Sequence, residues 1–138
     1  MNLEQALHQR WSNDAALNSL LPADRVTTGR SSLGSLPRAT LARQSRRTVC
    51  RTNSGETLEE VTVEMRLRHD SFDAAVAVVQ QFLTVFDRSQ VSLADGAEVQ
   101  SLRRIQDDCR QDSDGTWQFL VEMLARVRLL APTPPPEP

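Results

Sequence analysis

The sequence contains no lysine and no tyrosine, and it has only four phenylalanines and two tryptophans. So few aromatic side chains disfavour a surface on which several bases of a nucleic acid stack. The positive charge comes from sixteen arginines, which eighteen acidic residues outnumber, so that the net charge is -2. Dedicated nucleic-acid-binding domains usually carry a clear basic excess. The composition therefore argues against a protein whose main task is to bind nucleic acid.

Cysteines and long apolar runs are also scarce. Cys50 and Cys109 are the only thiols, which is too few for a disulfide framework and fits a reducing compartment. No apolar run reaches the roughly 18 residues that a membrane-spanning helix needs. The first residues lack the basic flank and the apolar stretch of a secretory signal. We therefore expect a soluble intracellular chain with no membrane partner.

The length and composition predict one globular domain. The chain has 138 residues, of which 39% are hydrophobic and 25% are charged, close to the averages of folded domains. Residues 131–138 contain five prolines in eight positions. Such a segment favours an extended, poorly ordered end. We expect a single domain over residues 1–130 and a disordered tail over 131–138.

The first part of the chain combines a helical segment with extended segments. Apolar residues at helical spacing predict a helix over 3–21 that ends before Pro22, with a kink or break where residues 12–14 can cap a second turn series. Residues 25–30 favour a short strand, and residues 38–52 look extended and strongly basic, before a turn at residues 53–55.

A strand followed by a helix is the clearest pattern in the sequence. Apolar and polar residues alternate over 61–67, which predicts a strand with one wet face. Asp70 and Ser71 can then cap a helix that extends to Phe86. The apolar positions of this helix match one buried face: Phe72, Ala75, Val76, Val79, Phe82, Leu83 and Phe86.

A closing hairpin follows a loop through Asp95 and Gly96. Its second arm alternates from Trp117 to Leu129, whereas its first arm has a polar run with scattered apolar residues. A three-residue turn at 113–115, with Gly115 in the left-handed conformation, brings these apolar residues to one face. We therefore predict three cross-strand pairs: Cys109 with Phe119, Ile105 with Met123, and Val99 with Leu129.

Charge is distributed unevenly along the chain. Residues 1–52 hold eight arginines and three acids, a balance of +5, whereas residues 53–138 hold eight arginines and fifteen acids, a balance of -7. Such a dipolar surface suits head-to-tail contact between copies. The most concentrated cluster is a candidate assembly surface: Arg38, Arg43, Arg46, Arg47 and Arg51.

Two interpretations of this arginine cluster remain open. Arginine makes bidentate contacts with carboxylates or phosphates, so the cluster can bind an acidic partner or a nucleic-acid backbone. Alternatively, it is the solvated face of a strand and loop. Replacing Arg46 and Arg47 together with alanine is expected to weaken assembly or partner binding under the first interpretation only.

The sequence does not support a metal, cofactor or catalytic site. The only histidines, His8 and His69, and the two cysteines lack the short spacing of zinc ligands, and we read the cysteines as thiols of buried strands. The acids around Gly115 resemble a calcium loop, but Arg110 and Val121 would occupy its first and last ligand positions. No nucleophile or phosphate-loop motif occurs. We expect no enzymatic activity.

Four features recur in order between about Leu3 and Leu130. They are Ala15–Leu21 followed by Asp24-Arg25-Val26; Leu36-Pro37 opening a strand; Val61–Met65 leading into Ser71–Phe86; and Asp114–Trp117 opening the last strand. In these features the chain resembles a family of small tailed-phage proteins known as tail-completion, tail-terminator or head–tail joining proteins. The chain departs from the family pattern at two places. After Leu36-Pro37 the family usually continues with an aromatic and β-branched residues, whereas this chain has Arg38-Ala39-Thr40. An aromatic often closes the strand before the long helix, whereas this chain has Arg68-His69.

The resemblance implies an α+β fold, with a mostly antiparallel sheet and with the N-terminal helix and one long amphipathic helix packed on one face. It also implies a structural role without reaction or cofactor. The chain would form a ring, typically a hexamer, that caps the tail tube and joins it to the head connector. Its partners would be the tube and connector proteins, with DNA only as passing cargo. Assembly would occur in the host cytoplasm before incorporation into the virion.

An alternative hypothesis needs no phage. A small α+β binding or adaptor module of a bacterial cell would have the same composition, and a prophage remnant of the joining family would remain cytoplasmic. The two hypotheses differ in their mass in solution. A concentration-dependent ring favours the joining protein, and a strict monomer favours the adaptor.

Overall fold

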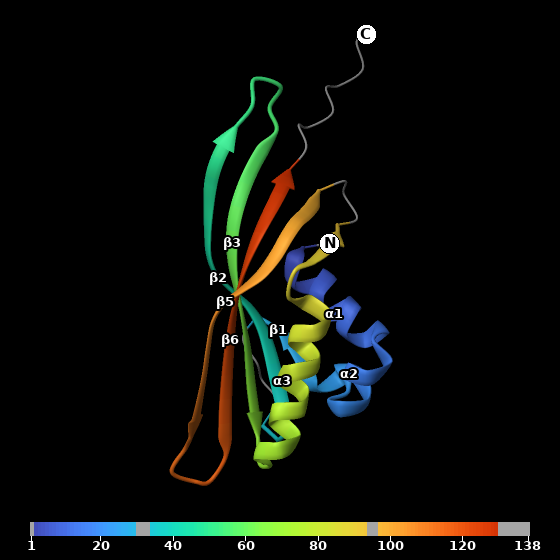
Figure 1. Ribbon diagram of the computed structural model, residues 1–138, viewed down its shortest axis with the longest axis vertical. Coiled ribbons are helices and arrows are strands. Elements are labelled where there is room, and N and C mark those ends of the chain that lie inside the picture. The colour runs from blue at the N-terminus through green and yellow to red at the C-terminus, as the bar shows by residue number, and fades with distance from the viewer. Residues whose placement is uncertain (1, 30–33, 94–96, 130–138) are drawn as a thin grey trace.

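The computed structural model describes residues 2–29, 34–93 and 97–129, and Figure 1 shows the course of the chain. The predicted proline-rich tail lies outside the described residues. The elements, in chain order, are α1 (Leu3–Asn13), α2 (Ala15–Leu20), a 3-10 turn (Ala23–Arg25), β1 (Val26–Thr28), β2 (Arg38–Arg51), β3 (Thr57–His69), α3 (Phe72–Phe86), β4 (Ser89–Ser92), β5 (Glu98–Gln111) and β6 (Trp117–Leu129).

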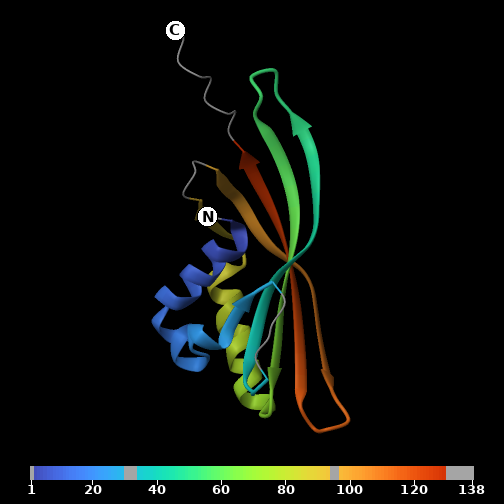
Figure 2. The same ribbon diagram turned by 180° about the vertical axis from the view of Figure 1, so that it is seen from behind.

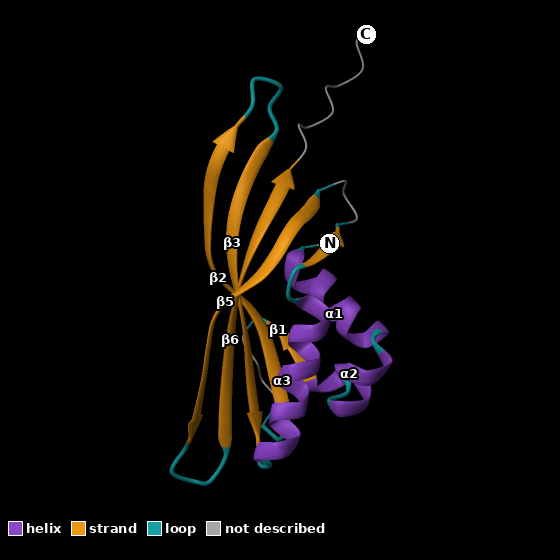
Figure 3. Cartoon of the chain, in the orientation of Figure 1, coloured by secondary structure: helices purple, strands orange, loops and turns teal. Residues whose placement is uncertain are grey.

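The described strands form one sheet in the order β1-β2-β3-β6-β5-β4. β1 pairs parallel with β2, and the other four pairings are antiparallel. The long strands are strongly twisted, so that they cross in projection at mid-length (Figures 1 and 2). The three helices lie on one face of the sheet, and the chain is an α+β protein (Figure 3).

The predicted break in the N-terminal helical segment is confirmed. Asn2 caps α1 and forms a capping box with Gln5. Asp14 then has an extended backbone, and its side chain accepts a hydrogen bond from the Leu17 amide at the start of α2. The buried Trp11 indole donates to the Leu21 carbonyl over 2.9 Å. This bond fixes the angle at which α2 folds back against α1.

α3 begins and ends where the sequence predicts. Ser71 caps its first turn, and Phe86 is its last residue. The buried stripe is Ala75, Val78, Phe82 and Phe86. The predicted face was therefore wrong at two positions, because Val78 is buried and Phe72 is exposed. Spacings of 3, 4 and 4 residues put Val78 on the stripe, whereas Phe72 stands at the helix start and contacts the Trp117 ring, 4.7 Å away between centroids.

β3 and β6 form the centre of the core. The strand predicted over 61–67 is confirmed with its apolar face buried, and β3 extends further at both ends. The predicted wet face was wrong at Glu64, which is buried and accepts a hydrogen bond from Arg66. β6 alternates in the same way, and the two strands pair without a register shift from Thr57 opposite Leu129 to His69 opposite Trp117. Their inward side chains pack against the helices: Val61, Val63, Met65, Leu67, Phe119, Val121, Met123, Ala125 and Val127.

The register of the closing hairpin was predicted correctly only near its turn. The three-residue turn at 113–115 is confirmed, with Gly115 at φ 87°, and Cys109 lies opposite Phe119. The other two predicted pairs were wrong, because bulges at Gln100 and Ile105 shift the strand. Met123 faces Arg104, and Val99 faces Val127. Each bulge adds a residue to one strand, which the alternation of its partner does not reveal.

The two edge strands differ in how far the sequence indicated them. β1 lies within the predicted segment 25–30. β4 was not predicted, because its four residues, Ser89 to Ser92, have only one apolar member. It follows Arg88, which has a left-handed backbone with φ 61°. This residue turns the chain from the end of α3 onto the edge of β5.

We predict that Gly115→Ala destabilises the protein by about 1–2 kcal/mol, because an L residue resists a left-handed backbone. No atom lies within 4 Å of the added Cβ, so the loss reports the backbone alone. Gly34→Ala is the matched control, because its Cβ also meets open space and its φ lies outside that region. Urea unfolding of both variants measures the difference, and an equal midpoint for the two would contradict the prediction.

We also predict that Phe82→Ala costs about 3–5 kcal/mol of unfolding free energy, because it leaves a cavity in the core. Phe82 is 1% exposed and contacts the rings of Trp11 and Phe86. Phe72→Ala, the same change on the same helix, should cost only about 1 kcal/mol, since Phe72 is 44% exposed. Thermal unfolding followed by circular dichroism compares the two variants.

Candidate functional site

Two hairpin arms extend from opposite ends of the sheet, beyond the helices (Figure 1). The first arm, residues 43–60, consists of the outer half of β2, its turn and the start of β3. The second arm, residues 105–121, consists of the outer half of β5, its turn and the start of β6. The turns match, because Gly55 and Gly115 both have φ 87° and each donates a backbone hydrogen bond three residues back. We call these two segments the first arm and the second arm.

The five arginines predicted as an assembly surface all lie on β2. Four of them belong to the first arm, whereas Arg38 lies at the other end of the strand. The structure thus brings Arg43, Arg46, Arg47 and Arg51 together. It also shows what the sequence did not: three of these four make ion pairs within the chain.

The pair between Arg43 and Glu4 joins the first arm to α1. The guanidinium donates to both carboxylate oxygens, from Nε over 2.8 Å and from Nη2 over 3.4 Å. The Glu4 side chain is only 10% exposed, so this pair supplies hydrogen bonds to a carboxylate that is largely shielded from water. Arg43 therefore has a structural role in addition to any role in assembly.

Arg46 and Arg47 contact acids on the neighbouring strand. Arg46 lies 2.7 Å from Glu59, and Arg47 lies 2.9 Å from Glu60. Their side chains remain 56% and 74% exposed, so each guanidinium keeps donors available for another molecule. Arg51 is exposed and makes no ion pair with the described residues. Glu59 and Glu60 precede the predicted strand 61–67, so a hairpin register extended through 53–55 could have revealed these pairs.

The second arm is acidic. Residues 105–114 contain Asp107, Asp108, Asp112 and Asp114 against the single Arg110. Hydrogen bonds from the side-chain hydroxyl and backbone amide of Thr116 lower the pKa of Asp114, so this carboxylate stays charged. Asp112 lies 2.8 Å from Arg68 of β3. These contacts make Asp112 and Asp114 part of the structure of the hairpin turn.

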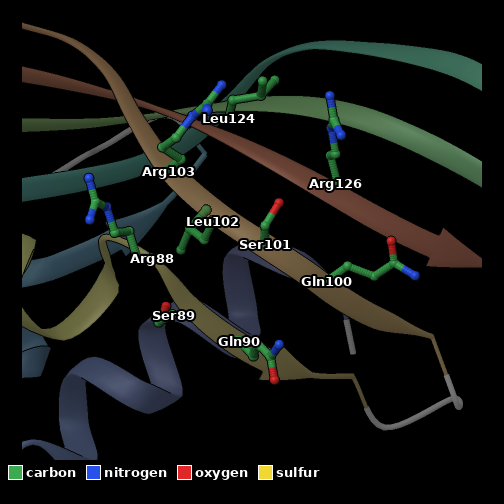
Figure 4. A pocket seen from close by; sticks show the side chains of 9 residues that line it. All are labelled: Arg88, Ser89, Gln90, Gln100, Ser101, Leu102, Arg103, Leu124 and Arg126. Atoms are coloured by element: carbon green, nitrogen blue, oxygen red, sulfur yellow. The ribbon is translucent and has the colours of Figure 1, made fainter.

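A recess of about 270 Å³ lies between β4, β5 and β6, outside both arms (Figure 4). Arg88, Arg103 and Arg126 line it together with serine, glutamine and leucine side chains, and none of the described acidic residues lines it. Guanidinium groups around a recess of this kind attract carboxylates or phosphates. A second recess, of about 540 Å³, lies on the sheet near Arg38, Arg66 and Arg68, but Glu64 also lines it.

The histidines and cysteines are dispersed in the structure. His8 contacts two backbone carbonyls, and the His69 ring accepts a hydrogen bond from the Ser71 amide. The expectation that Cys50 and Cys109 are buried was wrong, because both lie on the exposed outer halves of β2 and β5. Partial desolvation and the Asp108 carboxylate raise the pKa of Cys109. Within the described ranges, no three His, Cys, Asp or Glu side chains gather as metal ligands.

None of the described helices combines the length and the apolar character needed to cross a membrane.

A family model for the tail completion protein gp17 matches residues 5–128, which is nearly the whole described chain. The chain belongs to this family. The tail-completion family was the one that the sequence resembled, so that prediction is confirmed. Among curated proteins, none matches this tail-completion protein.

A solved structure has the same fold as this tail-completion protein. It is a chain from the "Virion of native gene transfer agent (GTA) particle", with a TM-score of 0.67 and 15% sequence identity. The match covers 91% of this chain and 94% of the other. At this identity the likeness concerns the fold. The family match and the shared fold make the chain a phage-like structural tail component.

We predict that Arg43→Ala destabilises this tail-completion protein by about 1.5–3 kcal/mol, because it leaves the Glu4 carboxylate without its partner. Arg51→Ala is the control on the same strand and should change stability by less than about 0.5 kcal/mol. Adding Glu4→Gln to Arg43→Ala should recover part of the loss, since it removes the unpaired charge. Urea unfolding of the three variants provides the measurement, and equal losses for Arg43→Ala and Arg51→Ala would refute a structural role.

Proposed function

We propose that this tail-completion protein caps the tail tube and joins it to the head connector, as a ring of identical subunits. The observation that carries this proposal is the match of the tail-completion family model to residues 5–128. The two arms support it, since they leave strands exposed at both ends of the sheet. A ring needs two different contact surfaces on each subunit, and arms that differ in charge offer them: the balance is +1 over residues 43–60 and -3 over residues 105–121.

The proposed role is mechanical and requires no reaction or cofactor. A ring on the head-proximal end of the tube stops its growth and presents a surface to the connector, and it is typically a hexamer in this family. DNA passes through the ring as cargo without base-specific contacts. The protein assembles in the host cytoplasm and then remains in the virion, or stays cytoplasmic if it belongs to a prophage remnant.

Within this proposal, the arginines of the first arm are part of the surface between subunits. Arg46 and Arg47 have exposed guanidinium groups and keep donors after pairing with their own acids. Arg51 adds a charge that no described residue neutralises. The three side chains therefore offer bidentate contacts to the carboxylates of a neighbouring molecule.

We predict that native mass spectrometry shows a closed oligomer that forms as the protein concentration rises. Mixed with the tube protein of the same particle, the chain should shorten the tubes seen by electron microscopy. The Arg46→Ala/Arg47→Ala variant should require a higher concentration for the oligomer, because it removes intersubunit contacts. Circular dichroism shows whether this variant is folded.

One outcome would contradict the proposal, and a second would contradict only the role of the arginines. A chain that stays monomeric at every concentration and leaves tube length unchanged favours the adaptor module. An oligomer that forms equally well with the double variant leaves the ring in place but removes the arginines from its contact surface.

A further inference from the structure

Two long strand segments have no partner on one side within the part of the chain that the structure describes. β1 covers β2 only as far as Leu41, so β2 pairs with β3 alone over residues 43–51. β4 covers β5 only as far as Leu102, and the Asp87 side chain accepts a hydrogen bond from the Arg104 amide. From Ile105 to Gln111, β5 pairs with β6 alone. We call these segments the β2 edge and the β5 edge.

Exposed strand edges invite pairing with another chain, and proteins usually shorten or protect them. The β2 edge is nine residues long and the β5 edge seven. At roughly 3.3 Å per residue, their lengths are about 30 Å and about 23 Å. Both carry bulges, at Gln44 and Val49 in one and at Ile105 in the other. Bulges and charges can keep other strands away from an edge, or they can select one particular partner strand. The side chains on each edge indicate which of these two roles applies.

An exposed apolar side chain marks each edge. Val49 and Ile105 are both 46% exposed, and both occupy bulges where no residue of the paired strand faces them. Among the described residues, Leu20 and Phe72 are the other large apolar side chains with such exposure. A protective edge gains nothing from an apolar side chain, whereas an edge that another strand covers buries it favourably.

Charge selects which edges can meet. The β2 edge holds Arg43, Arg46, Arg47 and Arg51 with no acid of its own, a balance of +4, although three of these arginines pair with acids of α1 and β3. The β5 edge, residues 105–111, holds two acids and one arginine, a balance of -1, and the turn that follows adds Asp112 and Asp114. Contact between two β2 edges brings like charges together, and so does contact between two β5 edges. The favourable combination is a β2 edge with the β5 edge of another copy.

We propose that the β2 edge of one subunit pairs antiparallel with the β5 edge of the next subunit, so that the sheet continues around the assembly. β2 and β5 run in opposite directions within the sheet, so two copies in the same orientation meet antiparallel. The edges lie at opposite ends of the molecule (Figure 1), so neighbouring copies are staggered along the strands. The contact is heterologous, as a ring requires. This inference rests on the proposed ring.

The two cysteines provide a direct test. Cys50 lies on the β2 edge and Cys109 on the β5 edge, and both are exposed. Within one chain they pair with Leu58 and, through Phe119, with Leu67, nine positions apart on β3. At roughly 3.3 Å per residue this separates them by about 30 Å along the strand. A short cross-link between Cys50 and Cys109 therefore joins different subunits.

The experiment treats the assembled full-length protein with a bismaleimide that spans about 13 Å, because centring residues 43–51 on residues 105–111 leaves Cys50 and Cys109 four positions apart along the paired strands. The pH is mildly alkaline, because the pKa of Cys109 is raised. Denaturing gels should show a ladder of covalent oligomers. The Cys50→Ser and Cys109→Ser variants should each lose it, since one thiol per subunit cannot connect unlike edges. An equimolar mixture of the two variants should give cross-linked dimers and nothing larger. Mass spectrometry of the linked peptides identifies the Cys50–Cys109 pair.

Each contrary result has a defined meaning. Dimers formed by either single variant alone would show like edges in contact and would overturn the inference. An oligomer in native mass spectrometry that gives no cross-link would overturn the inference but leave the proposed ring standing. A monomer under all conditions would overturn both.

Discussion

The contact between α3 and the paired strands β3 and β6 is the constraint on which the rest of the structure depends. Phe82 and Phe86 pack against side chains from both strands, which pair over thirteen positions without a bulge. These two strands are the central pair of the sheet, with two further strands on each side. Burial of this apolar layer supplies the main favourable free energy of folding, so the remaining elements form around it.

The sequence predicted this central unit because its pattern is strong. The alternation in 61–67 and the stripe in α3 follow one period each over many residues, and the start of α3 carries a capping serine. Prediction failed where one residue changes the outcome. The bulges at Gln100 and Ile105 shift the β5 register, and β4 is too short to show a period. Such details depend on tertiary contacts that local sequence does not contain.

The candidate surface was predicted in part, and for a definable reason. An arginine cluster is visible in a sequence, but its partners belong to other segments, such as Glu4 in α1 and Glu59 in β3. Because of those pairs, the arginines have a role within the monomer as well, since one guanidinium has enough donors for an acid of its own chain and for a neighbouring molecule. The sequence also did not predict that Cys50 and Cys109 are exposed, because a strand pattern does not show which part of a long strand the helices leave uncovered.

The helices cover the middle of the sheet and leave both hairpin ends bare. Backbone amides in the uncovered ends open to solvent by small local fluctuations, whereas those beneath α3 open only when the whole domain unfolds. Hydrogen–deuterium exchange should therefore divide this single sheet into a slow centre and two fast ends. Binding that orders either end would appear as a gain in protection at that end, far from any change in the core.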